Sequence, residues 1–122
     1  MKNLLLVMLG GGAGSGFRYL VSVLGRKYFH TDFPLATLLI NISGSLLIGV
    51  ILGYCINHQP KNETLALLLA TGFCGGFTTF SAFAFENLKL IQANQSGQAL
   101  LYICTSVILG ILAVWLGTKL VR

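Results

Sequence analysis

The chain has 122 residues, a mean hydropathy of +0.82, 55% hydrophobic residues and only 9% charged residues. Soluble domains average about 25% charged residues, so this composition excludes an ordinary soluble enzyme and a disordered tail. The net charge of +5 comes from eight basic and three acidic residues. Because the basic residues stand beside long uncharged stretches, as they do at the ends of membrane helices, the charge indicates no nucleic-acid partner.

Four long stretches of the chain carry almost no charge, and each can cross a bilayer, which takes about 20 apolar residues. They predict membrane spans over residues 3–25, 33–57, 64–85 and 97–118. These spans use almost the whole chain and leave no room for a catalytic or nucleic-acid-binding domain outside the membrane. We therefore predict an all-α integral membrane protein with a single four-helix domain over residues 1–122.

Glycines crowd the first span. Gly10 and Gly14 form one GxxxG pair, and Gly12 and Gly16 form another. Such pairs let the backbones of two membrane helices approach closely, so they predict a helix contact face. Arg18 follows this face. We expect Arg18 near a membrane surface or facing water or protein, because exposing a charge to lipid is costly.

The second span contains a polar stripe. Asn41, Ser45, Gly49 and Gly53 recur every fourth residue and therefore share one side of a helix. A buried amide without a partner is expensive, so Asn41 must face another helix or an aqueous path. The sequence leaves both of these alternatives open.

The third span changes character over residues 72–83, which read GFCGGFTTFSAF. Three glycines within five residues, followed by two threonines, predict a broken helix near residues 75–79. Broken backbone at membrane depth must be buried by protein or line a cavity, and its free carbonyl oxygens suit a hard cation such as Na⁺. If the helix restarts after the break, Phe80 and Phe83 share a face, either as packing or as part of a pathway.

Two further features concern the end of the third span and one side of the fourth span. Glu86 ends the uncharged run of the third span, as either a boundary carboxylate or a vestibule residue. Tyr102, Ser106 and Gly110 share a stripe of the fourth span. The hydroxyl groups on this stripe can bond to their own helix backbone or face a partner.

The sequence does not favour an enzyme, because no predicted span holds a carboxylate pair or a histidine that could act in catalysis. A proton-coupled cation or drug exporter needs a titratable carboxylate deep in a span. The three acidic residues, Asp32, Glu63 and Glu86, all fall at predicted span ends. This placement counts against such an exporter.

An anion pathway needs hydrogen-bond donors and positive edges instead. The spans supply the amide N–H groups of Asn41 and the hydroxyl groups of Ser81 and Ser106. The rings of Phe80 and Phe83 can turn their positive edges toward a small anion. The polar inventory therefore favours an anion pathway.

Residues 14–19, 39–44 and 72–83 together resemble segments of the Fluc/CrcB family of fluoride channels. Residues 14–19 (GSGFRY) look like the Gly-rich end of the family's first helix, and residues 39–44 (LINISG) resemble the segment around its second-helix asparagine. Residues 72–83 closely match the family signature G-x-x-G-G-x-[ST]-T-F-S-[TS]-F. Ala82 departs from this signature, where the family usually has Thr or Ser, and Gly110 stands where some members have Ser.

The resemblance implies an antiparallel, dual-topology homodimer in the bacterial plasma (inner) membrane that exports fluoride passively, with the lipid bilayer and a second copy as its partners. It also implies a structural Na⁺ held by the backbone carbonyls of Gly75 and Thr78. By motif position, Arg18 and Glu86 match family positions of less defined role. The residues implied along the fluoride pathway are Asn41, Phe80, Phe83, Ser81 and Ser106.

The loop charges agree with insertion in both orientations. Basic residues in short loops set orientation, and acidic residues contribute little. One predicted side of the membrane holds Lys2, Lys61, Lys119 and Arg122. The other holds Arg26, Lys27 and Lys89, with Arg18 as a further member if it reaches that surface. The bias is too small to impose one topology, and a small dual-topology cation or drug exporter remains the alternative function.

Overall fold

The computed structural model describes residues 1–58 and 63–122, and within these ranges the regular structure is entirely helical. Four helical segments are long and apolar enough to cross a membrane: Lys2–Tyr28, Leu35–His58, Glu63–Gln92 and Ser96–Leu120. The predicted all-α fold with four membrane helices is thus confirmed. In chain order the elements are α1 (Lys2–Tyr28), α2 (Leu35–His58), α3 (Glu63–Leu65), the π-helix η1 (Ala66–Cys74), α4 (Gly75–Phe77), α5 (Phe80–Gln92) and α6 (Ser96–Leu120).

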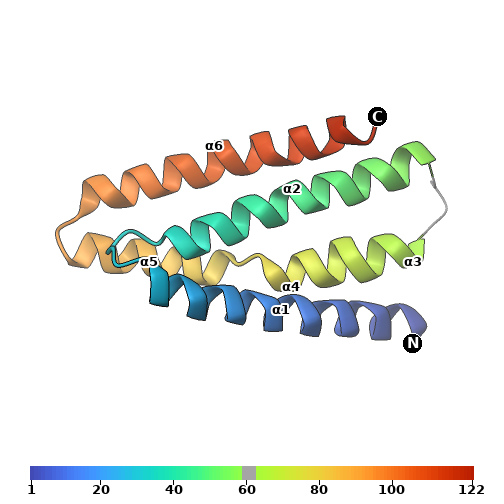
Figure 1. Cartoon of the computed structure of the whole chain (residues 1–122), viewed down its shortest axis with the longest axis horizontal. Coiled ribbons are helices and arrows are strands. Elements are labelled where there is room, and N and C mark those ends of the chain that lie inside the picture. Colours follow the sequence, from blue (N-terminus) through green and yellow to red (C-terminus); the bar gives the residue numbers. More distant parts are fainter. Residues whose placement is uncertain (59–62) are drawn as a thin grey trace.

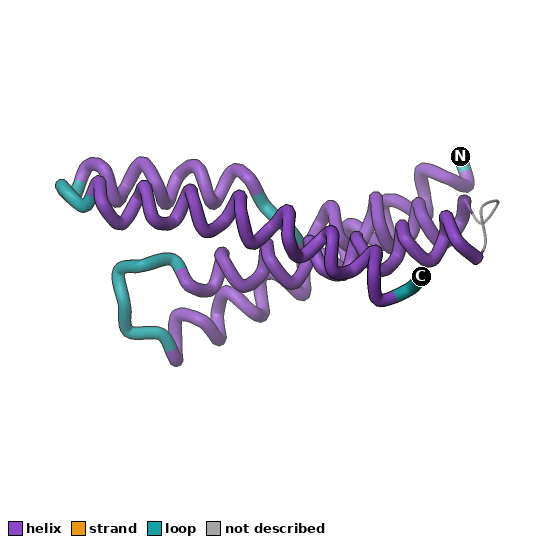
Figure 2. Tube along the Cα trace, turned by 90° about the horizontal axis from the view of Figure 1, so that it is seen from above, coloured by secondary structure: helices purple, strands orange, loops and turns teal. Residues whose placement is uncertain are grey.

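Both termini lie at the same end of the bundle (Figure 1). The turns that join α1 to α2 and α5 to α6 lie at the other end, where the α1–α2 pair diverges from the α5–α6 pair (Figure 2). Lys2, Lys119 and Arg122 belong to the first end. Lys61, a fourth basic residue predicted on this side of the membrane, lies outside the described residues.

Helices α2 and α6 pack backbone against backbone because glycines face the contact. A Cβ atom added at Gly49 would collide with the Val114 carbonyl, and one added at Gly117 would collide with the Leu46 carbonyl. Lipid tails are as apolar as the helix surfaces, so the hydrophobic effect does not drive membrane helices together. Small residues allow the close approach that strengthens van der Waals contact instead. Van der Waals packing at these two glycines therefore stabilises the pair.

Gly49→Ala and Gly117→Ala are expected to destabilise the protein by about 1–3 kcal/mol each, as overpacking a tight contact does. Gly97→Ala in α6 is the matched control, because a Cβ atom there meets nothing within 4 Å in the described part of the chain. Alanine also favours a helix more than glycine does, so the control should unfold at the same temperature or higher. Thermal unfolding in detergent checks this, and equal melting of all three variants would show that α2 and α6 do not rely on this contact.

The two GxxxG pairs of α1 have different surroundings. Gly10 and Gly14 pack on the backbone of the third membrane segment within the same chain, against the carbonyls of Leu68 and Phe73. Gly12 and the exposed Gly16 have open space where a side chain would be. The expected single contact face is therefore wrong in detail, because the pairs project to different sides of α1 and only one meets the rest of the chain.

Candidate functional site

The third membrane segment breaks at Thr78 and Thr79 alone, whose backbones are extended (φ −77°, ψ 159° and φ −150°, ψ 127°). The predicted break is confirmed, but it is narrower than residues 75–79, since α4 remains helical over Gly75–Phe77. Gly76 stays helical and packs against the Gly11 carbonyl of α1. Gly72 and Gly76 thus serve close packing, while two β-branched residues, which favour extended backbone, form the break.

Asn41 of α2 holds the break from one side. Its Nδ2 donates to the Thr79 carbonyl at 3.0 Å, and the Thr79 N–H donates to its Oδ1 at 2.8 Å. The amide thereby replaces the backbone partners that a continuous helix would supply. Asn41 therefore contacts the neighbouring broken segment, and it also lines a cavity beside the break. That contact uses one of the two N–H donors on Nδ2, and within the described ranges the other has no protein acceptor.

Helix α1 holds the break from the opposite side. Ser15 Oγ donates to the Gly76 carbonyl at 3.3 Å, and Arg18 Nη1 donates to the Thr78 carbonyl at 3.3 Å. Because the Thr79 N–H points to Asn41, the Gly75 carbonyl lacks the i+4 donor of a continuous helix. Carbonyl oxygens at the break are therefore paired with side chains or left without a helical donor.

A cavity of about 520 Å³ opens beside the break. It brings together six of the predicted site residues from α2, the broken segment and α6. Ser81, Arg18 and Glu86 are predicted site residues that do not line it. Ser81 is exposed and its hydroxyl group lies 3.3 Å from that of Thr79. The lining residues are Asn41, Gly44, Ser45, Ile48, Cys74, Gly75, Thr78, Thr79, Phe80, Phe83, Ser106 and Val107.

Ser106 differs from the hydroxyl residue next to it. Thr105 Oγ1 donates to its own helix, to the Leu101 carbonyl at 2.7 Å. Ser106 Oγ is buried and has no hydrogen-bond partner in the described part of the chain. Leaving a buried hydroxyl group unpaired costs roughly 1–3 kcal/mol, so this atom calls for a water molecule or a bound ion in the cavity.

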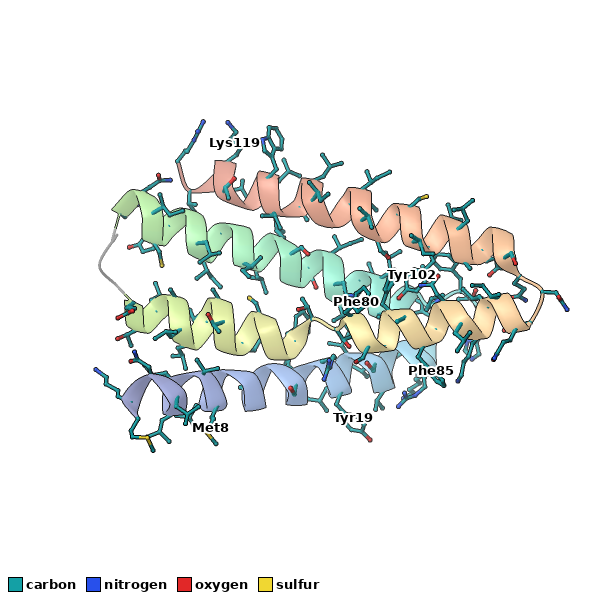
Figure 3. The ribbon with its side chains drawn as sticks, turned by 180° about the vertical axis from the view of Figure 1, so that it is seen from behind. Met8, Tyr19, Phe80, Phe85, Tyr102 and Lys119 are labelled. Carbon is teal, nitrogen blue, oxygen red and sulfur yellow. The ribbon has the colours of Figure 1, made fainter. Side chains whose placement is uncertain are left out.

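Phe80 and Phe83 share a face, with ring centroids 5.7 Å apart. Phe83 is half-buried and packs edge-on against Tyr102 at 5.0 Å. Phe80, in contrast, is 77% exposed although it lines the cavity. Figure 3 shows Phe80 and Tyr102 on the side of α5 that faces α2 and α6, and Phe85 on the opposite side. Packing within one chain therefore explains Phe83 and not Phe80.

Glu86 lies inside α5, because the third segment continues as helix past this carboxylate to Gln92. Thr37 Oγ1 donates to Glu86 Oε1 at 2.7 Å, and the Tyr102 hydroxyl group donates to Oε2 at 2.9 Å. Sequence reasoning missed Thr37, although it precedes Asn41 by one helical turn and so extends the same stripe.

The described residues contain no group of three His, Cys, Asp or Glu side chains that could together bind a metal ion. The oxygen atoms at this site are instead main-chain carbonyls, side-chain hydroxyl groups and the Asn41 amide. The break offers the carbonyl oxygens of Gly75 and Thr78, and Gly75 adjoins open space.

Residues 5–118 match the family described as CrcB-like protein, Camphor Resistance (CrcB). A protein from Flavobacterium psychrophilum named fluoride-specific ion channel FluC is 49% identical over 117 residues, covering 96% of this chain and 94% of the relative. Proteins of the same name from Phocaeicola vulgatus and an Anaeromyxobacter strain are 45% and 42% identical, covering 96% and 100% of this chain and 96% and 97% of the relatives. The chain belongs to the CrcB family.

Proposed function

We propose that this chain forms a fluoride-specific channel that lets fluoride leave the cytoplasm passively. The observation that carries the proposal is the high identity, over nearly the full length, to relatives named fluoride-specific ion channels. The site agrees with that chemistry. Its cavity offers a spare N–H of Asn41 and the unpaired hydroxyl group of Ser106 beside aromatic rings, and it contains no carboxylate.

A passive pore suffices for export. Fluoride enters a cell as the uncharged acid and dissociates inside, and a negative-inside potential drives the anion out by about 2.3 kcal/mol per 100 mV. Donors at Asn41 and Ser106 would replace part of the hydration shell of the ion. The ring edges of Phe80 and Phe83 carry partial positive charge and suit a small anion.

Fluoride efflux from liposomes tests the proposal. Liposomes loaded with potassium fluoride and containing the purified protein should release fluoride when valinomycin balances the charge. The same liposomes loaded with potassium chloride should retain chloride. Fluoride retention, or export of an organic cation driven by a proton gradient, would instead support the small exporter.

The functional unit is proposed to be a homodimer. Phe80 is mostly exposed, and Gly12 and Gly16 form a small-residue pair where an added Cβ atom meets nothing within 4 Å in the described part of the chain. A second copy would cover these surfaces and enclose the cavity. In an antiparallel pair each chain presents the same face to the other, as a two-fold axis requires.

The residues at the break fit a structural Na⁺ only if two chains contribute. One chain offers the Gly75 and Thr78 carbonyls, whereas a hard cation normally takes about six oxygen ligands. Two copies double the number of carbonyls and leave room for water. When bound, such an ion would join two broken segments and add positive charge near the anion path.

Gly75→Leu is expected to impair dimer formation and leave the fold of one chain intact, because a Cβ atom at this exposed position meets nothing within 4 Å in the described part of the chain. Gly76→Leu is the contrasting variant, since it must collide with the Gly11 backbone. Light scattering in detergent measures the dimer fraction, and circular dichroism measures the helix content. A Gly75→Leu protein that remains fully dimeric in sodium would place the interface elsewhere.

Dual topology is proposed from the balance of charges. Within the described residues one end of the bundle carries Lys2, Lys119 and Arg122, and the other carries Arg26, Lys27 and Lys89. Lys61, a basic residue predicted on the same side as the first end, raises the bias to only one charge, and so small a bias leaves orientation undetermined by the positive-inside rule. Impermeant labelling of the C-terminus should reach it on both sides of the membrane, and labelling from one side alone would contradict the proposal.

A further inference from the structure

Arg18 is a charged residue deep in a membrane helix. It stands ten residues before the end of α1 at Tyr28, which is about 15 Å along the helix axis. Its side chain is half-buried, and its one hydrogen bond within the described ranges goes to the Thr78 carbonyl at 3.3 Å. No carboxylate in those ranges comes within salt-bridge distance. No ion pair in those ranges therefore balances the guanidinium charge, and the group binds a neutral oxygen.

That oxygen is also one of the two proposed ligands of the sodium ion. Thr78 lies in the extended break, so its carbonyl receives no bond from the following turn, and Arg18 supplies the donor instead. A cation on the same oxygen would stand beside a second positive charge. In a low-dielectric site two like charges a few ångströms apart repel strongly.

We infer that Arg18 competes with the sodium ion for the Thr78 carbonyl and thereby sets the sodium concentration at which two copies assemble. The inference rests on the proposed sodium site and extends it. Without the ion, Arg18 and Ser15 from α1 hold the carbonyls of the broken segment, while Asn41 holds Thr79 from α2. Binding of the ion then requires Arg18 to withdraw or to share its acceptor.

Sodium titration of assembly tests the competition. The dimer fraction and the melting temperature of the full chain in detergent are measured while sodium replaces choline at constant ionic strength. Arg18→Gln keeps an N–H donor and removes the charge, so its midpoint should fall by about tenfold or more. Arg18→Lys keeps the charge and should stay near the wild-type midpoint. Arg26→Gln, at an exposed position of the same helix, should also match the wild type.

Three results would overturn the inference: an unchanged or higher midpoint for Arg18→Gln, an equal drop for Arg18→Lys, or a wild-type protein that ignores sodium. Fluoride efflux from liposomes made with the same protein preparations tests the proposed channel function independently of the sodium competition. If Arg18→Gln does not fold, Arg18→His supplies the charge contrast in one protein, because histidine is cationic near pH 5.5 and neutral near pH 8. The competition requires a lower sodium midpoint at the higher pH in this variant and not in the wild type.

Discussion

Asn41→Asp is expected to reduce fluoride flux at neutral pH by at least about 100-fold. A carboxylate retains the acceptor for the Thr79 N–H but loses the donor to the Thr79 carbonyl, so two oxygens face each other across the break. It also removes the spare N–H and places a negative charge at the cavity. A unit charge about 4 Å from the ion, at an effective dielectric constant near 20, opposes it by about 4 kcal/mol.

Asn57→Asp is the matched control for this variant. Asn57 lies near the end of the same helix, is exposed, and donates to the Val121 carbonyl at 3.3 Å. It lies outside the cavity at the break, so its flux should stay near the wild-type value. Wild-type flux in the Asn41→Asp protein would remove Asn41 from the pathway and leave it as a clamp on the broken helix.

Phe80→Ile and Phe83→Ile are each expected to lower fluoride flux by more than about tenfold, because isoleucine fills similar space without a positive ring edge. Their effects on stability should differ. Phe80 is 77% exposed in one chain, so Phe80→Ile should leave chain stability nearly unchanged. Phe83→Ile removes an edge-on contact with Tyr102 and should cost about 1 kcal/mol.

Phe85→Ile separates a pathway effect from general loss of aromatic area. Phe85 is 57% exposed, belongs to the same helix, and faces away from the cavity with Lys89 over its ring at 4.7 Å. Liposome efflux and thermal unfolding should show normal flux for this control. Full flux in both Phe80→Ile and Phe83→Ile would make these rings ordinary packing.

Much of the architecture was predictable from the sequence, because lipid imposes simple rules. Uncharged runs of sufficient length predicted four spans, and four helices capable of spanning are present. The composition of residues 72–83 indicated a break, and the spacing of Phe80 and Phe83 placed both rings on one face. These inferences depend on local composition and helical period alone, so they need no knowledge of neighbouring segments.

Partners were not predictable, because periodicity gives the side of a helix on which a residue lies and not what that side meets. Only the tertiary structure shows that Gly10 and Gly14 pack within the chain while Gly12 and Gly16 remain open. Four further features depend on contacts between segments far apart in sequence. These are the break at Thr78 and Thr79, the pairing of Asn41 with Thr79, the bond from Arg18 to Thr78, and the two donors around Glu86.

The amino-acid sequence alone therefore determined the class of the protein, the number of its spans and the segment that carries the candidate site. Hydrophobic length and glycine content act along the chain, and they are readable from it. The tertiary structure decided which carbonyl oxygens lack a helical donor, which hydroxyl group is unpaired and which small-residue and aromatic surfaces are exposed. Each of these features depends on the position of side chains from another helix. A buried polar group forms a hydrogen bond with the partner that tertiary packing places within bonding distance.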